Sequence, residues 1–207
     1  MKNPWEEIEL DVYERHMSLD SVAQLQALNR LMREQLEAYP VRTAMILGVA
    51  GGNGLEHVCR EKYETVYGVD LNQAYLQAAA QRHPALEGVL RLLHLDLTKD
   101  AAQLPQAELV IANLLIEYIG YAAFQTVLEQ VRPRYVSCVI QINDDTRDWV
   151  SDSPWLHAFD GLDAIHHQMD PQEFTAQLEQ IGYRETLRSA EPLPNGKQFL
   201  RLDYRPG

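Results

Sequence analysis

The sequence predicts an α/β protein with a doubly wound, mostly parallel seven-stranded sheet. From residue 43 onward, short apolar runs alternate with segments of helical spacing. The apolar runs are nearly continuous, which is typical of parallel strands that are covered on both faces. Near the end of the chain, Pro194-Asn195-Gly196 separates two strand-like runs. Because Asn-Gly between strands is a strong hairpin signal, we expect the sheet to finish with an antiparallel C-terminal hairpin strand.

Residues 1–40 are expected to form an N-terminal helical cap. Apolar side chains recur at helical spacing over residues 18–39, which predicts an amphipathic helix. Ser21 and Gln24 have the spacing of a capping box, which predicts that this helix begins there. The preceding residues 4–17 are mixed in character and aromatic, and they predict a shorter helix.

Residues 41–207 are expected to form the main domain. Its predicted strands cover residues 43–49, 65–70 and 89–96, a fourth run that begins near residue 108, and residues 134–143. Its predicted helices cover residues 53–62, 72–83 and 121–131. A last helix is predicted to begin after Asp170, a good N-cap residue, with Pro171 in the first position and Glu173 completing a capping box. Gly182 has the place of a helix-ending glycine.

The segment 144–169 interrupts this alternation. It is polar, it contains Trp149 and Trp155, and it holds three histidines. A loop of that length inside a compact domain is usually functional or mobile. We therefore expect it to be a substrate loop.

Composition limits the classes of function. The chain has 207 residues, of which 46% are apolar and 23% charged, as in an ordinary soluble domain. A formal charge of −12 argues against a nucleic-acid surface, which needs a basic face. No apolar stretch approaches the roughly 20 residues of a membrane span, and the acidic start has no signal-peptide character. We expect a cytoplasmic monomer or homodimer that acts on a small molecule and contacts neither nucleic acid nor membrane.

The two cysteines, Cys59 and Cys138, fit a reducing compartment. They show no metal-ligand spacing, and no metal site is predicted. Both lie in apolar surroundings, so we expect two buried and inert thiols.

Residues 45–58, MILGVAGGNGLEHV, place four glycines in seven positions directly after a predicted strand. Glycine is used where the backbone needs φ > 0 or where another group approaches it closely, so this turn predicts a ligand site. A phosphate-binding P-loop would require a lysine after the glycines, and none follows them. A dinucleotide site would place its third glycine where this chain has His57.

The stretch Gly48-Val49-Ala50-Gly51-Gly52-Asn53-Gly54 resembles the first motif of class I S-adenosylmethionine (SAM)-dependent methyltransferases. Three further stretches resemble the next motifs in order, at the ends of the next three strands: VYGVDLN, LHLDLT and IANLLIEYIG. The resemblance covers about residues 41–205. It implies a Rossmann-like fold, SAM as the cofactor and in-line transfer of a methyl group to a small-molecule acceptor.

The resemblance also implies which residues bind the cofactor. Asp70 would accept hydrogen bonds from both ribose hydroxyls, and Asp96 would receive the adenine amino group beside the backbone of Leu97. Asn113 would lie beside the methionine end of the cofactor. The implied set is Gly48, Val49, Ala50, Gly52, Gly54, Asp70, Leu71, Asp96, Leu97 and Asn113.

Two positions depart from the family pattern. The family usually has Glu or Asp where this chain has Gly48, and Gly where it has Ala50. The usual acid helps to position the amino end of the cofactor. The extra glycines, Gly51 and Gly52, would compensate by letting the backbone approach the cofactor closely.

No catalytic residue is predicted, because an in-line displacement needs alignment and exclusion of water but no obligatory dyad. The methyl acceptor is expected where the family places it: after the fourth strand, in the cap and in the 144–169 loop. The substrate candidates are Tyr13, His16, Glu117, Tyr118, Trp155 and His157.

Two alternatives remain open from the sequence. The fold could serve as a catalytically silent SAM-binding or protein-interaction module, since the acid usual at Gly48 is missing. A NAD-dependent oxidoreductase is a further alternative, which His57 and the terminal hairpin disfavour.

Overall fold

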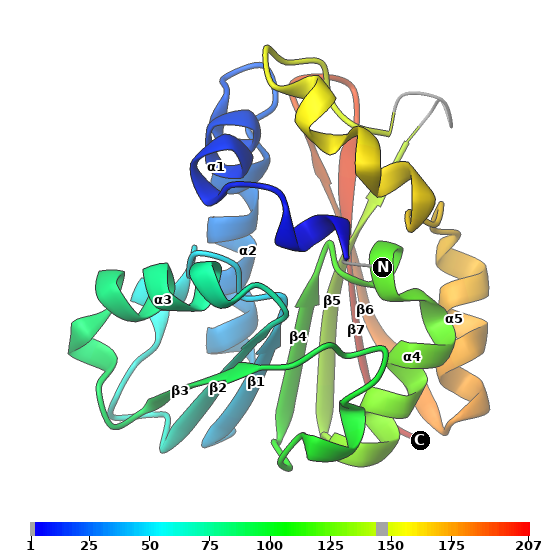
Figure 1. Cartoon of the computed structure of the whole chain (residues 1–207). Coiled ribbons are helices and arrows are strands. Elements are labelled where there is room, and N and C mark those ends of the chain that lie inside the picture. Colours follow the sequence, from blue (N-terminus) through cyan, green and yellow to red (C-terminus); the bar gives the residue numbers. More distant parts are fainter. Residues whose placement is uncertain (1–2, 144–148) are drawn as a thin grey trace.

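The computed structural model describes residues 3–143 and 149–207, which form a seven-stranded sheet with helices on both faces (Figure 1). The strands are β1 (Thr43–Leu47), β2 (Thr65–Asp70), β3 (Leu90–His94), β4 (Leu109–Asn113), β5 (Tyr135–Ile142), β6 (Tyr183–Pro192) and β7 (Gln198–Pro206). The α-helices are α1 (Leu10–Ser18), α2 (Gln24–Ala38), α3 (Gln73–Arg82), α4 (Ile116–Val131) and α5 (Pro171–Gln180). Short 3-10 helices lie at η1 (Pro4–Glu6), η2 (Leu55–His57), η3 (Pro84–Leu86), η4 (Ala101–Gln103) and η5 (Leu156–Ala164).

The strand order is β3-β2-β1-β4-β5-β7-β6. The pairs from β3 to β5 are parallel, whereas β7 runs antiparallel to both β5 and β6. The turn between β6 and β7 is closed by the amide of Leu193, which donates to the carbonyl oxygen of Lys197 at 2.8 Å, and Gly196 takes a φ of +83° there. The predicted doubly wound sheet and its antiparallel hairpin strand are therefore confirmed.

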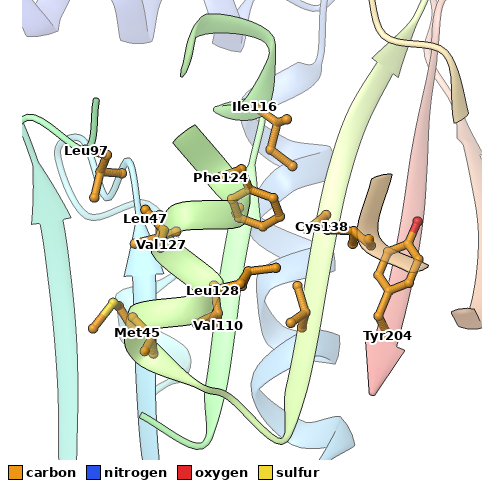
Figure 2. Close-up of a cluster of buried hydrophobic side chains, with 14 of the residues drawn as sticks. Met45, Leu47, Leu97, Val110, Ile116, Phe124, Val127, Leu128, Cys138 and Tyr204 are labelled. Carbon is orange, nitrogen blue, oxygen red and sulfur yellow. The ribbon is translucent and has the colours of Figure 1, made fainter. Parts of the chain in front are cut away.

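Alternate residues of each central strand belong to opposite layers of the core. Met45 and Leu47 of β1 pack with α4 and α5, whereas Ala44 and Ile46 pack with α2 and α3. Figure 2 shows the first layer, in which Phe124 of α4 lies against the strands. Burial on both faces explains why the strand sequences are almost continuously apolar.

The start of α2 differs from the prediction. Its N-cap position is Ala23, with a φ of 51°, and no side chain caps the helix. The amides of Val22 and Ala23 instead donate to the carbonyl oxygen of Leu19 at 2.8 and 2.7 Å. The predicted capping box of Ser21 and Gln24 is therefore wrong, because a local turn uses the backbone ahead of the helix.

The helix predicted over residues 53–62 is also wrong, since only η2 forms in that stretch. Gly54 has a φ of 91°, and Val58 is extended with a ψ of 111°, so helical geometry stops on both sides. The side chain of Asn53 donates to the carbonyl oxygen of Leu25 at 3.0 Å, which ties this turn to α2. Long-range contacts thus replace the local helix.

The two cysteines have different surroundings. Cys138 lies in β5 with no exposed surface, and burial raises the pKa of its thiol well above the usual range. Cys59 is exposed, and its thiol donates to Oε2 of Glu61 at 3.1 Å. The predicted burial is correct for Cys138 and wrong for Cys59, which lies just past the end of η2.

The elements around the C-terminal half follow the sequence more closely. Asp170 caps α5 by accepting from the amides of Gln172 and Glu173 at 2.9 and 2.7 Å, and Gly182 has a φ of +85° just after the helix. In α4, which begins earlier than predicted, Gly120 has a φ of 74° and separates the first turn from the rest. Of the predicted loop 144–169, residues 149–169 contain η5, and residues 144–148 lie outside the described residues.

Candidate functional site

A cavity lies at the carboxyl ends of the central strands, at the point where the strand order reverses between β1 and β4. Its wall includes Gly48 and Ala50 after β1, Asp70 at the end of β2, Asp96 after β3 and Asn113 at the end of β4. In open α/β sheets, ligands bind at this edge and at this reversal. Figure 1 shows η1 and α1 lying over the same edge. We call this cavity the first cavity.

The glycine turn contributes to the first cavity mainly through Gly48 and Ala50, whose φ values are +68° and +47°. Val49 is buried and does not line the wall. The other glycines face the protein. An added Cβ at Gly51 would lie 2.5 Å from the side chain of Arg82. A Cβ at Gly52 would lie 2.9 Å from that of His83, and one at Gly54 would lie 2.6 Å from that of Met32. The turn therefore packs closely on neighbouring side chains at all three glycines, and the positive φ of Gly52 and Gly54 further favours glycine there.

Asp70 ties the end of β2 to the glycine turn. Its Oδ2 accepts from the amide of Ala50 at 2.9 Å, and its Oδ1 accepts from the amide of Asn72 at 2.8 Å. Burial raises the pKa of this carboxyl, and the two amides oppose that effect. A carboxylate has about four lone-pair positions, so each oxygen of Asp70 keeps capacity for a further donor from a ligand.

Asp96 lies after β3 and lines the first cavity. Burial acts to raise its pKa, but the hydrogen bonds from Lys99 and Thr98 outweigh it and lower the pKa. The Lys99 ammonium lies 2.6 Å from Oδ2, and the Thr98 hydroxyl donates to Oδ1 at 2.6 Å. Leu97, which follows, is buried and lines the same wall, so apolar and acidic groups alternate there.

Asn113 is held by α2. Its side-chain amide exchanges two hydrogen bonds with that of Gln35, at 2.9 and 2.8 Å. The next residue, Leu114, has a φ of 53°, which is strained for a leucine, and it lines the cavity. Backbone strain of this kind gathers at functional sites, which agrees with the position of this loop.

The N-terminal segment covers the first cavity and is anchored beside it. Trp5 and Tyr13 form part of the wall. The side chain of Asn72 donates to the carbonyl oxygen of Trp5 at 3.0 Å, and the hydroxyl of Tyr75 donates to that of Ile8 at 2.8 Å. These bonds connect η1 and the start of α1 to the first turn of α3.

A second cavity adjoins the first and shares four wall residues with it: Trp5, Tyr13, Leu114 and Tyr118. The second cavity is otherwise bounded by α1, the first turn of α4, the end of β5 and residues 149–166. It also contains His16, Glu117 and His166. Of the predicted substrate candidates, Tyr13, His16, Glu117 and Tyr118 are thus brought together around it.

Glu117 is the acidic group of the second cavity. It is 4% exposed, and its Oε1 accepts from the amide of Gln141 at 3.0 Å. Its Oε2 has no hydrogen-bond partner within the described residues. Burial raises the pKa of Glu117 to about 7, so this carboxyl can exchange a proton near neutral pH.

The two histidines of the second cavity are neutral at pH 7, because burial lowers the pKa of His16 and of His166 to about 4. His166 stacks on Trp149 with ring centroids 3.8 Å apart, and Nδ1 of His16 lies 2.8 Å from the hydroxyl of Ser153. Both rings are therefore part of the packing of this wall.

The remaining candidates, Trp155 and His157, line neither cavity. Trp155 packs beside Phe159 and Leu162, and the His157 side chain is 90% exposed next to Asp160. The sequence did not single out Trp5, and it placed Trp149 only in a general loop. Neither tryptophan belongs to a motif, so only the clustering of aromatic residues in the two segments signalled them.

The described residues, 3–143 and 149–207, contain neither a cluster of metal-ligating side chains nor a helix that could span a membrane. No group of three or more His, Cys, Asp or Glu side chains there is arranged to hold a metal ion. No helix in this part of the chain has the length and apolar character needed to cross a membrane.

Comparison of the sequence with protein-family models and with curated proteins gives no match. Solved structures are similar at low sequence identity. Magnesium protoporphyrin IX methyltransferase from Synechocystis PCC 6803, with bound SAM, has a TM-score of 0.70 at 10% identity and covers 100% of this chain and 98% of its own. The N-methyltransferase NodS from Bradyrhizobium japonicum WM9, in complex with S-adenosylhomocysteine (SAH), has a TM-score of 0.69 at 14% identity, with 99% of both chains covered.

The fold is that of the class I SAM-dependent methyltransferases. The predicted Rossmann-like architecture is thereby confirmed. The [4+2]-cyclase SpnF is also similar to this chain, with a TM-score of 0.65 at 11% identity and with 87% of this chain and 80% of its own covered. Because one fold can host different reactions, activity has to be argued from the two cavities.

Proposed function

We propose that this protein binds SAM in the first cavity and transfers its methyl group to a small molecule in the second. The observation that carries the proposal is the amide-oriented carboxylate of Asp70, which faces the same cavity as Asp96 and the glycine turn. The similar solved structures with bound SAM or SAH support the choice of cofactor.

The wall of the first cavity fits the adenosine part of SAM. Asp70 would bind the ribose hydroxyls with its remaining lone pairs, and Asp96 would bind the adenine amino group. The apolar side chains of Leu71 and Leu97 would flank the ring. This assignment needs no rearrangement of Asp70, since both of its hydrogen bonds to the protein come from backbone amides.

The fit at the methionine end is different. Gly48, Asn113 and Leu114 form this part of the wall, and the acid usual in the family is absent at Gly48. Asn113 supplies the polar side chain in this part of the wall, and a hydrogen bond from Gln35 holds it in place. We propose that neutral amide and backbone groups bind the amino acid part of SAM here.

When bound, SAM would supply a methyl group made electrophilic by a positively charged sulfur. The chain's own residues would align the acceptor and exclude water. Trp5, Tyr13 and Tyr118 line both cavities, so the acceptor would approach the methyl group along the wall that these rings form. Residues 1–40 would serve as the cap, and the described part of the 144–169 loop would close the acceptor side.

Calorimetric titration with SAM, SAH and NADH tests the cofactor. We expect SAM and SAH to bind one site per chain and NADH to show no binding. Binding of NADH in place of SAM would contradict the proposal. Detection of SAH as a product, formed from SAM in the presence of an acceptor panel, would then distinguish an enzyme from a silent SAM-binding module.

A further inference from the structure

The second cavity contains a buried carboxyl that the protein itself satisfies only in part. Oε1 of Glu117 accepts from Gln141, and Oε2 has no partner within the described residues. A buried, unpaired oxygen costs about 1–3 kcal/mol or more. Such a group in a cavity wall is suited to a donor that comes from a ligand.

Aromatic side chains line the same cavity as this carboxyl. Trp5 meets Tyr118 at a centroid distance of 4.9 Å and an angle of 87°, and it meets Tyr13 at 5.8 Å and 83°. Tyr118 and Trp149 are 6.2 Å apart at 65°. At these distances the rings pack edge to face on one another, so together they form a continuous aromatic wall of the second cavity. An ammonium group can lie favourably over the exposed face of such a ring.

The other titratable side chains that line this wall are uncharged at pH 7, so they neither repel nor attract a cation by charge. Burial lowers the pKa of His16 and His166 to about 4, and it raises the pKa of Tyr13 and Tyr118, so all four are neutral. The Lys197 ammonium acts on the two histidines from beside the cavity, and its Nζ donates to the carbonyl oxygen of Trp149 at 2.6 Å.

We propose that the second cavity takes a small amine, whose nitrogen hydrogen-bonds to Oε2 of Glu117 and whose carbon skeleton packs against the aromatic wall of Trp5, Tyr13 and Tyr118. The inference rests on the proposed function, because it assigns the acceptor to the cavity that shares its wall with the first. The formal charge of −12 of the whole chain also favours a cationic partner.

Glu117 would act on the proton of this amine. An ammonium ion that enters the cavity pairs with the ionised carboxylate. Transfer of one proton from nitrogen to Oε2 then leaves a neutral amine with a free lone pair and a neutral carboxylic acid, so charge and protons balance. A carboxyl that titrates near pH 7 is suited to this exchange.

The test is calorimetric titration of the SAH-saturated protein with benzylamine, phenethylamine and isobutylamine, each compared with the alcohol of the same shape. The variants are Glu117→Gln and, as a matched control on the same helix, Glu129→Gln, whose side chain is exposed. We expect at least one amine to bind, and Glu117→Gln to weaken it 10- to 100-fold, as for a lost hydrogen bond to a charged group. Glu129→Gln should leave amine affinity unchanged, and both variants should bind SAH as the wild type does.

Three results would overturn the inference. The first is that none of the three amines binds, and the second is that Glu117→Gln and wild type bind the amine with equal affinity. The third is that Glu117→Gln loses as much affinity for the matching alcohol as for the amine, which would assign a hydroxyl acceptor instead. Each leaves the proposed function standing if SAH binds. Failure of SAH to bind, with amine binding that still depends on Glu117, would instead remove the methyltransferase proposal and retain the amine site.

Discussion

The amide of Ala50 donates a hydrogen bond to Oδ2 of Asp70 at 2.9 Å, so the turn after β1 and the end of β2 are joined at the wall of the first cavity. The bond connects residues that belong to different sequence motifs. It orients the carboxylate on which the proposed cofactor site depends, and it accompanies a φ of +47° at Ala50.

Replacing Asp70 tests that dependence. Asp70→Ala should weaken SAM binding by about 1.5–3 kcal/mol for each ribose hydrogen bond to the charged group that it removes. Asp70→Asn, which keeps one oxygen acceptor, should lose less. Calorimetric titration measures both, with Asp20→Ala as an exposed control. Wild-type affinity in a folded Asp70→Ala protein would show that SAM does not contact this carboxylate.

Trp5 provides a test of the cap. Trp5→Ala removes a ring that lines both cavities. The rate of methyl transfer should fall at least tenfold, because water can enter and the acceptor is no longer held in line with the methyl group. Trp155→Ala is the matched control, since Trp155 lines neither cavity. Turnover is measured as SAH formation, with circular dichroism to confirm folding. Equal activity of the two variants would remove Trp5 from the site.

The buried carboxyl of Glu117 should make stability depend on pH. Its pKa is raised from 4.5 to about 7, so the folded protein keeps a proton that the unfolded chain has lost. The stability gained from this proton is present below pH 4.5 and is lost as the pH rises to about 7.

Glu117→Gln cannot ionise, so it should match the wild type near pH 4.5 and exceed its free energy of unfolding by about 3 kcal/mol above pH 8. Urea denaturation of both proteins from pH 5 to pH 8 measures this difference, and contributions from the histidines cancel in the comparison. A difference that stays constant over this range would argue against a raised pKa.

Asp203 and Arg201 form a buried pair in β7, with Nε to Oδ1 at 3.0 Å and Nη2 to Oδ2 at 2.6 Å. The hydroxyls of Ser137 and Tyr39 also donate to Asp203. Asp203→Ala would leave the guanidinium without its buried partner and should cost about 3–5 kcal/mol of folding free energy.

The double variant Asp203→Leu/Arg201→Met should recover most of that loss, because it removes both buried charges. Urea denaturation compares the single and double variants with the wild type. Equal stability of Asp203→Ala and wild type would mean that the pair is not structurally important.

The two thiols should differ in reactivity. Cys59 is exposed, whereas Cys138 has no exposed surface and a raised pKa. A disulfide reagent at pH 8 should therefore label one thiol in the native protein and the second only after unfolding. Cys59→Ser should abolish the fast reaction, as read from the absorbance of the released thiolate. Fast labelling of Cys138 would contradict its burial.

The sequence by itself determined the elements whose signals are local. Continuous apolar runs predicted the strands, Asn195-Gly196 predicted the hairpin, and Asp170 predicted the start of α5, because turn geometry and capping depend on a few neighbouring residues. The same local strand patterns predicted that Asp70 and Asp96 lie at strand ends. Parallel strands bring such ends to one edge of the sheet.

Tertiary structure decided what depends on contacts between distant segments. In the stretch 53–62 only η2 forms, the Asn53 side chain bonds to Leu25 of α2, and Cys59 is exposed. Only folding brings Trp5 against Tyr118 and leaves Oε2 of Glu117 buried without a partner within the described residues. No local pattern encodes these features, because burial and hydrogen-bond satisfaction depend on which side chains meet in space, whatever their separation along the chain.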